Sequence, residues 1–588
     1  MAQSCNEYEE NFLLGKDYIK QLTVGGFQTF ADPIAIPFGP LTLLYGPNSA
    51  GKSALLDAML ALADLCEVLA PIDWLRGFKN HRVASILDRH WRRESVMPVI
   101  LAKKLKLGAV IRIAGEEWAQ AGFAHRGEHF YQLSPLKNFE TCFRTLRPLW
   151  KADGLDLEIS LLYGLSSNGD LLIDSQALAQ EQRIEVRING SAILVFDAPA
   201  RLACLNLDHP ALLAWDAAPD LRWMAHRFSD GFVTKSGWFG TRVSAIHDGW
   251  LSTNAIDVIE HDLSEDERPR ARNAEDSFLC MFDALFRACM RSMSSTLRVP
   301  LVPASRAVPT RSELTFLLAA DGKQLRGEPL GLRADGLPEH LGITQSAFEA
   351  ELKRYENSER HPEDPLGLIN DAPQEKAPID LVNRLLREYL FSTSGYFLAA
   401  GVHEFTSLRP LRSDEKNVYT DAGRRFLVSL ELSDSTGRRF NFDEVGSGLG
   451  YVLPVLLAVA TSRTVFLQQP ELHLHPALQS QLADALIVAL GDADFGGKNS
   501  RGCHQIIAET HSEHLLLRLL RRVRQAGDPK RSLDPHSLGR ESVVVLYVDP
   551  NPEGFSTVKH LRISRKGDFI DRWPNGFFEE RWTELFDE

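Results

Sequence analysis

The stretch that decides the fold is Leu41–Ser53, which reads LTLLYGPNSAGKS. Its first five residues are a short continuous apolar run, as in a strand that is buried on both faces. The next eight, Gly46–Ser53, match the pattern G-x-x-x-x-G-K-[ST]. Ala54–Ala70 follows, is rich in Ala and Leu, and is stopped by Pro71, as a helix would be. Strand, glycine loop and helix therefore arrive in the order of a phosphate-binding loop.

This loop predicts a nucleotide site. Glycines let backbone N–H groups wrap phosphates at the start of a helix. A lysine at position 52 reaches the β- and γ-phosphates, and the hydroxyl of Ser53 ligates Mg²⁺. A chance glycine turn explains the match poorly, because each glycine has a frequency of only about 7%. ATP and Mg²⁺ are thus the expected cofactors, and the predicted binding residues are Gly46, Pro47, Asn48, Ser49, Ala50, Gly51, Lys52, Ser53 and Ala54.

The C-terminal third alternates strands with helices. Thr464–Leu467 is a buried-strand pattern that runs into Gln468-Gln469-Pro470-Glu471, and His504–Ala508 runs into Glu509-Thr510-His511. Polar residues that follow strands in this way predict an α/β sheet with its site at the carboxyl ends of the strands. Further strands are predicted over 426–432 and 440–442, and helices over 450–460, 479–490 and 513–525.

The rest of the chain is patterned more weakly. Leu22 and Val24 alternate with polar residues in a predicted strand within Ile19–Phe30. Strand-like alternation recurs around 99–113 and 155–195, with a hairpin turn at Asn189-Gly190. Helices are predicted over 274–297 and 379–389, and a surface loop over 357–377. The absence of sustained heptads argues against a long coiled-coil arm.

Composition sets broader limits. With 588 residues, 44% hydrophobic and 24% charged, the chain predicts two or more globular domains. A net charge of −13 means that nucleic-acid binding would need a local basic region. The seven cysteines are scattered and odd in number, which favours a reducing, cytoplasmic location. The most apolar run, Tyr451–Leu467, is interrupted by polar residues, so no membrane span is expected.

Taken in order, five elements resemble the ABC-type ATPase heads of SMC-like and OLD-family proteins. Gly46–Ser53 resembles Walker A, Gly446–Gly450 the signature loop, and Phe466–Glu471 Walker B. Leu472–Pro476 resembles the D-loop, and His511 the switch histidine. OLD-related bacterial ATPases also carry a motif similar to Trp573-Pro574-Asn575-Gly576-Phe577-Phe578. The resemblance covers Tyr18–Ala70 and Phe440–Phe578.

The resemblance implies an α/β ABC-type ATPase head, a mixed sheet with flanking helices, built from residues 1–70 and 440–588. Residues 71–439 would then be a large α+β insertion that acts as a lid, a regulatory region or a partner-binding region. In this family Ser447 and Gly448 would contact the γ-phosphate held by the P-loop of a second copy. A homodimer with two composite ATP sites, or a higher oligomer, is therefore expected.

One departure from the family concerns catalysis. The family's Walker B strand ends in acids, the first assisting Mg²⁺ and the second acting as general base. Here Gln468 takes the metal position and Gln469 the base position. An amide does not accept a proton from water, so slow hydrolysis is expected. Glu471 is either a stand-in base or a structural residue of the D-loop, and His511 is the third expected catalytic residue.

The family implies an ATPase that serves as a dimeric sensor or scaffold for a separate effector, a nuclease of bacterial anti-phage defence. A DNA-repair or recombination ATPase that clamps DNA directly is the alternative, and a transporter motor is disfavoured. No D-x-D follows His511, which argues against a Toprim nuclease in this chain. His473 and His475 do not have zinc-ligand spacing. A basic helix predicts either a solvated face or nucleic-acid contact, through Arg518, Arg521, Arg522, Arg524, Lys530 and Arg531.

Overall fold

The structure is a computed structural model of the 588-residue chain. It describes residues 17–69, 85–86, 89–90, 105–113, 154–163, 183–197, 202–206, 208–213, 219–220, 223, 250–252, 264–306, 315–319, 378–410, 419–440, 442, 444–491, 503–527 and 538–574. The chain forms two compact units. Unit 1 is Met1–Val299 with Val544–Leu561, and unit 2 is Pro300–Val543 with Arg562–Glu588. Sheets and helices in both confirm the predicted α/β class.

Unit 1 contains an antiparallel sheet of eight strands in the order β2-β1-β4-β5-β6-β7-β8-β9. Along β5, buried apolar side chains alternate with half-exposed ones, so one face of the sheet covers a core. The turn between β6 and β7 is the predicted Asn189-Gly190, with φ of +50° and +81°. The strand bounds are β1 Tyr18–Gly25, β2 Ile34–Pro37, β4 Leu105–Ile113, β5 Leu155–Tyr163, β6 Arg183–Ile188, β7 Ser191–Asp197, β8 Leu202–Asn206 and β9 Trp250–Ser252.

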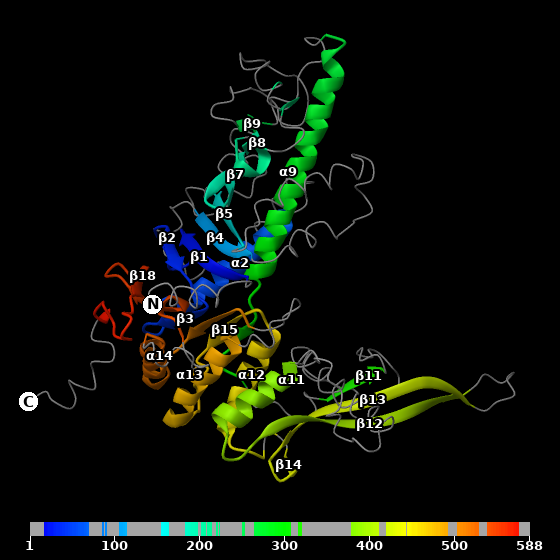
Figure 1. The fold of residues 1–588 in the computed structure, drawn as a ribbon, viewed down its shortest axis with the longest axis vertical. Helices are drawn as coiled ribbons and strands as arrows, with labels where there is room; N and C mark the ends of the chain where they lie inside the picture. Colours follow the sequence, from blue (N-terminus) through cyan, green and yellow to red (C-terminus); the bar gives the residue numbers. More distant parts are fainter. Residues whose placement is uncertain are drawn as a thin grey trace, which may run out of the picture. The chain divides into compact units, whose positions relative to one another are not determined.

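Two helices, α2 (Lys52–Leu69) and α9 (Glu267–Leu297), pack against each other in unit 1. Figure 1 shows α9 lying along the sheet. Both helices confirm predicted ones, although α9 begins seven residues earlier than predicted. The early start has a local cause: the Ser264 hydroxyl donates to Glu267 and the Ser264 carbonyl accepts from two helix N–H groups.

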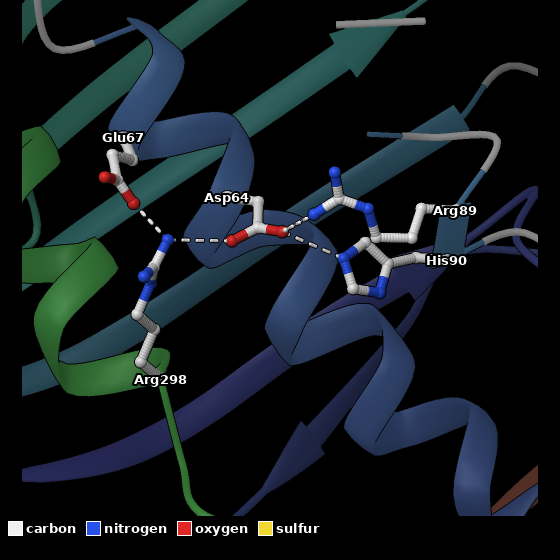
Figure 2. A network of polar contacts seen from close by, with 5 residues as sticks. All are labelled: Asp64, Glu67, Arg89, His90 and Arg298. Atoms are coloured by element: carbon white, nitrogen blue, oxygen red, sulfur yellow. Dashed lines mark hydrogen bonds and ion pairs between the residues drawn. The ribbon is translucent and has the colours of Figure 1, made fainter. Parts of the chain in front are cut away.

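A polar network ties α2 to the chain that leaves α9 (Figure 2). Asp64 Oδ1 accepts a hydrogen bond of 2.9 Å from Arg298, which also contacts Glu67. Asp64 Oδ2 lies 3.0 Å from His90 Nε2 and 3.5 Å from Arg89. Only about a fifth of the Asp64 side chain is exposed, so this carboxylate is the centre of the network. The helix that follows the P-loop is thereby fixed on its polar side.

Unit 1 also holds β3 (Leu41–Tyr45), β17 (Val543–Pro550) and β18 (Ser556–Leu561), in the order β3-β17-β18. Every residue of β3 is buried, as its apolar run predicts. Strands β17 and β18 form an antiparallel hairpin in which Val545 is opposite Leu561. The C-terminal part of the chain therefore returns to the unit that contains the P-loop.

Unit 2 contains three parallel strands, β10 (Leu301–Val302), β15 (Thr464–Gln468) and β16 (Gln505–Glu509). The predicted strands 464–467 and 504–508 are confirmed here, as are the three predicted helices, with α12 over Ser447–Thr461, α13 over Pro476–Gly491 and α14 over Glu513–Ala526. Helix α12 starts at Ser447 rather than at 450, because Gly446 serves as its N-cap and the glycines that follow are helical. The predicted helix over 379–389 is α11 (Pro378–Arg384) continued by a π-helical turn, Leu385–Leu390.

A long antiparallel ribbon of β12 (Phe397–Pro410) and β13 (Tyr419–Ser433) extends from the helices of unit 2 (Figure 1). Strands β11 (Thr315–Ala319) and β14 (Arg439–Phe440) also pair with β13. The predicted strand 426–432 is thus the inner half of a longer strand, and the predicted strand 440–442 contributes Phe440 alone. The predicted loop 357–377 lies outside the described residues. Within the described part of the chain, no helix combines the length and apolarity needed to cross a bilayer.

Candidate functional site

The glycine loop of unit 1 has a backbone that requires glycine. Gly46 has φ of +137° and Gly51 has φ of +101°, both in the region that side chains rarely adopt. A Cβ at Gly46 would lie 2.0 Å from the carbonyl oxygen of Val548 in β17. Ser49 is a third left-handed residue, with φ of +64°. The loop therefore follows β17 closely and turns its backbone toward the start of α2.

Lys52 lies folded over this loop. Its Nζ donates hydrogen bonds of 2.9 Å to the carbonyl oxygens of Gly46 and Pro47, and only 3% of the residue is exposed. The loop thus holds a buried ammonium group within its own curve, at the N-terminus of α2. A positive charge and a helix N-terminus together attract phosphate. Ser53 is exposed beside it, so its hydroxyl can reach a ligand.

Two hydroxyl groups, those of Ser556 and Thr29, support the glycine loop. Ser556 Oγ lies 2.6 Å from the carbonyl oxygen of Ala50 and 2.6 Å from Thr29 Oγ1. Ser556 has a single hydroxyl proton, which it can donate to the Ala50 carbonyl. The hydroxyl of Thr29 can then donate to Ser556 Oγ. A Cβ at Gly51 would lie 2.3 Å from Ser556 Oγ, so the second glycine is needed for this approach. No pattern in the sequence indicates Ser556, which is 506 residues from Ala50.

In unit 2, the carboxyl ends of β15 and β16 lie together, with Gln468 opposite Glu509. The chain turns sharply after β15, because Gln469 has a left-handed φ of +45° and its N–H donates to the Glu509 carbonyl at 2.7 Å. A left-handed non-glycine residue costs on the order of 1 kcal/mol and commonly marks a functional site. Gln468 and Gln469 are both partly exposed at this strand end.

Glu471 and His511 are brought together at the same edge. Glu471 Oε1 accepts a hydrogen bond of 2.9 Å from the backbone N–H of His511. Only 7% of Glu471 is exposed, and its Oε2 is buried without a hydrogen-bond partner among the described residues. Such a carboxylate oxygen is costly to bury unless something binds it. Glu471 therefore fixes the start of the loop after β16 with one oxygen, while its other oxygen is buried without a described hydrogen-bond donor.

Arg306 is the residue that fixes the turn after β15. It lies just after β10 and is 7% exposed. Burial lowers the pKa of its guanidinium, and the negative charge of Glu471 opposes that shift. The guanidinium of Arg306 donates five hydrogen bonds of 2.7–3.2 Å to backbone carbonyls, which are those of Pro303, Tyr451, Gln468, Gln469 and Pro470. A lone arginine in a loop belongs to no motif, so no pattern in the sequence indicates Arg306.

The signature-like loop contacts the D-loop-like segment within unit 2. A Cβ at Gly448 would lie 3.3 Å from the carbonyl oxygen of His473, so α12 begins against this segment. The ring of His473, a left-handed residue with φ of +62°, lies 4.2 Å from that of Tyr451 in α12. Ser447 is exposed at the first position of the helix. The end of β15, the segment Leu472–Pro476 and the start of α12 therefore lie together.

The basic helix α14 divides its arginines between a covered side and an exposed side. Arg522 makes two hydrogen bonds, of 2.7 and 2.9 Å, to Asp484 of α13, and both side chains are nearly buried. Arg518 lies 3.5 Å from the same carboxylate. Arg524 pairs with Asp568, and Arg521 is exposed. Arg518 and Arg522 thus join α14 to α13, whereas Arg521 and Arg524 lie on the exposed side, as the solvated-face interpretation expects.

The predicted site residues are divided between the two units. Unit 1 holds the P-loop set, and unit 2 holds Ser447, Gly448, Gln468, Gln469, Glu471 and His511. Lys530, Arg531 and the residues Asn575–Phe578 of the WPxGFF motif lie outside the described residues. In the parts of the chain that the structure describes, no group of three or more His, Cys, Asp or Glu side chains is arranged to hold a metal ion.

One family model matches part of the chain. Residues 335–518 match the family described as "AAA domain, putative AbiEii toxin, Type IV TA system". The matched range includes the signature-like loop, the ends of β15 and β16 and His511, and it does not reach the P-loop. A search among curated protein sequences finds no match.

Solved SMC heads are among the structures similar to this chain. The SMC head bound to the C-terminal winged-helix domain of ScpA is 10% identical, with a TM-score of 0.34 over 93% of this chain and 98% of the other. A Pyrococcus furiosus SMC head with an extended coiled coil, bound to the C-terminal domain of ScpA, is 10% identical, with a TM-score of 0.31 over 97% and 99%. The SMC head from Thermotoga maritima is 11% identical, with a TM-score of 0.30 over 93% and 100%.

Proposed function

We propose that this chain binds and slowly hydrolyses ATP, and that ATP holds two copies together as a sensor or scaffold for a separate effector. The observation that carries the proposal is the P-loop of unit 1, where Lys52 lies folded over a glycine loop at a helix N-terminus. Gly46–Ala54 would hold the phosphates. Ser53 would hold Mg²⁺, which would offset the negative charge of the phosphates.

Glu471, Gln469 and His511 are the proposed catalytic residues. The Oε2 of Glu471 supports a role in accepting a proton from water, since it is a buried carboxylate oxygen at this edge that receives no hydrogen bond from the described residues. Its other oxygen stays bonded to the His511 backbone. Gln469 can orient water but not deprotonate it. Slow turnover with tight nucleotide binding is the behaviour that this set of groups supports.

The effector and the biological setting rest on the family match and on the resemblance. The matched family's description refers to a toxin and a toxin–antitoxin system, which supports a role in bacterial anti-phage defence through a separate effector such as a nuclease. Direct clamping of DNA is the weaker alternative, because Arg522 and Arg518 of the basic helix are occupied by Asp484.

Nucleotide binding is tested by substituting Lys52. Lys52→Ala removes a buried cation from the loop, so ATP affinity measured by calorimetry should fall by about 100-fold, the value of roughly two charge-assisted contacts. Lys20→Ala is the matched control, since Lys20 is a unit 1 lysine that pairs with Asp156 at the surface. Unchanged affinity in Lys52→Ala would refute the site.

Association of two copies is tested at the start of α12. Ser447 is exposed, so Ser447→Arg should leave each copy folded while it blocks ATP-dependent pairing. Light scattering with a non-hydrolysable ATP analogue should show a dimer for the native chain and a monomer for the variant. Thr461→Arg, at the exposed opposite end of the same helix, is the control. A dimer that persists in Ser447→Arg counts against the proposed interface.

A further inference from the structure

The buried Arg306, just after β10, bonds to the turn that follows β15. Arg306 donates from Nη1 to the Gln468 carbonyl at 3.0 Å, and from Nη2 to the Gln469 and Pro470 carbonyls at 3.0 and 3.2 Å. Three successive carbonyls of one turn thus converge on a single guanidinium. This turn ends one residue before Glu471.

The same guanidinium also bonds to helix α12. Nε donates to the Tyr451 carbonyl at 2.7 Å. Arg306 therefore joins the helix that Ser447 begins to the turn that follows β15.

We propose that Arg306 is a positioning residue for ATP hydrolysis: it holds the left-handed turn at Gln469 so that Glu471 faces the reacting water. The turn needs such support, because Gln469 has φ of +45° and a relaxed backbone there would move both side chains. The inference rests on the proposed ATPase function. It assigns Arg306 no contact with the nucleotide, since its five N–H groups are already used within the protein.

Lysine and glutamine variants separate geometry from charge. A lysine keeps the positive charge but donates at most three hydrogen bonds from one nitrogen, so it does not bridge the five carbonyls. Arg306→Lys and Arg306→Gln should both lower kcat by about 100-fold, the effect of a misplacement of roughly 1 Å. The ATP dissociation constant and the stoichiometry of binding should stay within twofold of native values, because the P-loop lies in unit 1.

A control separates positioning from general instability. Arg522→Lys also removes a nearly buried guanidinium from unit 2, where it bonds to Asp484. It should lower Tm comparably but leave kcat per bound ATP within about threefold of native. An equal loss of kcat in Arg522→Lys and Arg306→Lys would overturn the inference, as would near-native kcat in Arg306→Lys.

Hydrogen exchange gives a readout that does not depend on hydrolysis. The Gln469 amide donates to the Glu509 carbonyl, and the Leu472 amide donates to the Gln469 carbonyl at 3.0 Å. Both amides should exchange at least tenfold faster in Arg306→Lys, while amides within α13 keep native protection. Unchanged exchange at these two amides would overturn the inference even in a chain that hydrolyses no ATP. A native chain that binds ATP without turnover would instead refute the proposed function.

Discussion

Gln468 and Gln469 lie at the end of strand β15, where the strand of a related ATPase would be expected to end in acids. The structure shows how the backbone at these two residues is held. The amides sit on a left-handed turn whose three carbonyls are bonded by Arg306. Two residues on, Glu471 carries a buried oxygen without a hydrogen-bond donor. The backbone of this turn is therefore held in one conformation, although the amide side chains of Gln468 and Gln469 are unable to accept a proton.

This arrangement predicts opposite effects for two substitutions. Gln469→Glu should supply a general base and raise ATP turnover by about 10²-fold or more, since such assistance is typically worth about 10² to 10⁴. Glu471→Gln should abolish the native activity if Glu471 is the stand-in base. Single-turnover assays measure both rates, with Glu553→Gln at an exposed turn as control. Native turnover near ~10 s⁻¹, the median for enzymes, with no gain in Gln469→Glu would contradict slow hydrolysis.

At the scale of elements, the sequence predicted strands and helices best where pattern and chemistry agree. The apolar run 41–45, the glycine loop and the helix after it became β3, the P-loop and α2 with boundaries shifted by two residues or fewer. The positions of β15, β16 and α14 were predicted equally well. Period and turn chemistry act locally, so one sequence contains this information.

Elements and site residues fixed by distant contacts were not predictable in the same way. The outer half of β13 is a strand because β12 pairs along it, not because of its own alternation. Arg306 and Ser556 acquire their roles from carbonyl groups that lie 162 and 506 residues away in the sequence. A residue whose partner is a backbone carbonyl leaves no complementary side chain in the sequence, so no pattern indicates it.

The interface of α2 with α9 makes a prediction about two thiols. Cys66 and Cys289 are fully buried, and burial raises the pKa of the Cys289 thiol to about 12. The pKa of Cys66 is raised as well, by burial and then by the charge of Cys289. Since an unburied thiol has a pKa of about 8.5, the thiolate fraction of Cys289 at pH 8 should be lower by a factor on the order of 10³.

Alkylation followed by peptide mass spectrometry should therefore leave both cysteines unmodified in the folded chain at pH 8 and modify both in urea. The raised pKa values also make stability depend on pH. Because the folded state keeps the two thiol protons to higher pH than the unfolded state, the contribution of the two thiols to the free energy of unfolding is complete below about pH 8.5. It falls as the pH rises from there toward 12, and urea midpoints should fall accordingly. Rapid alkylation of either cysteine under native conditions would show that the interface opens.

At the scale of the whole molecule, the P-loop depends on a segment from the other end of the chain. Ser556→Ala removes a hydroxyl from the Ala50 carbonyl and from Thr29. A buried hydrogen bond is worth about 1 kcal/mol, so ATP should bind roughly fivefold more weakly. Thr557→Val is the control, because its hydroxyl bonds to the Asp549 carbonyl in the same hairpin. Calorimetry that finds equal affinities would mean that the brace does not shape the loop.

The contact between Ser556 and the P-loop also sets a time scale for synthesis. Ala50 leaves the ribosome 506 residues before Ser556. At roughly 5–20 residues per second, the loop waits roughly 25–100 s for the strand that braces it. During translation the nascent chain therefore carries a complete glycine motif without its support. The growing polypeptide should therefore bind nucleotide more weakly than the finished chain until residue 561 has emerged and both ends of unit 1 have met.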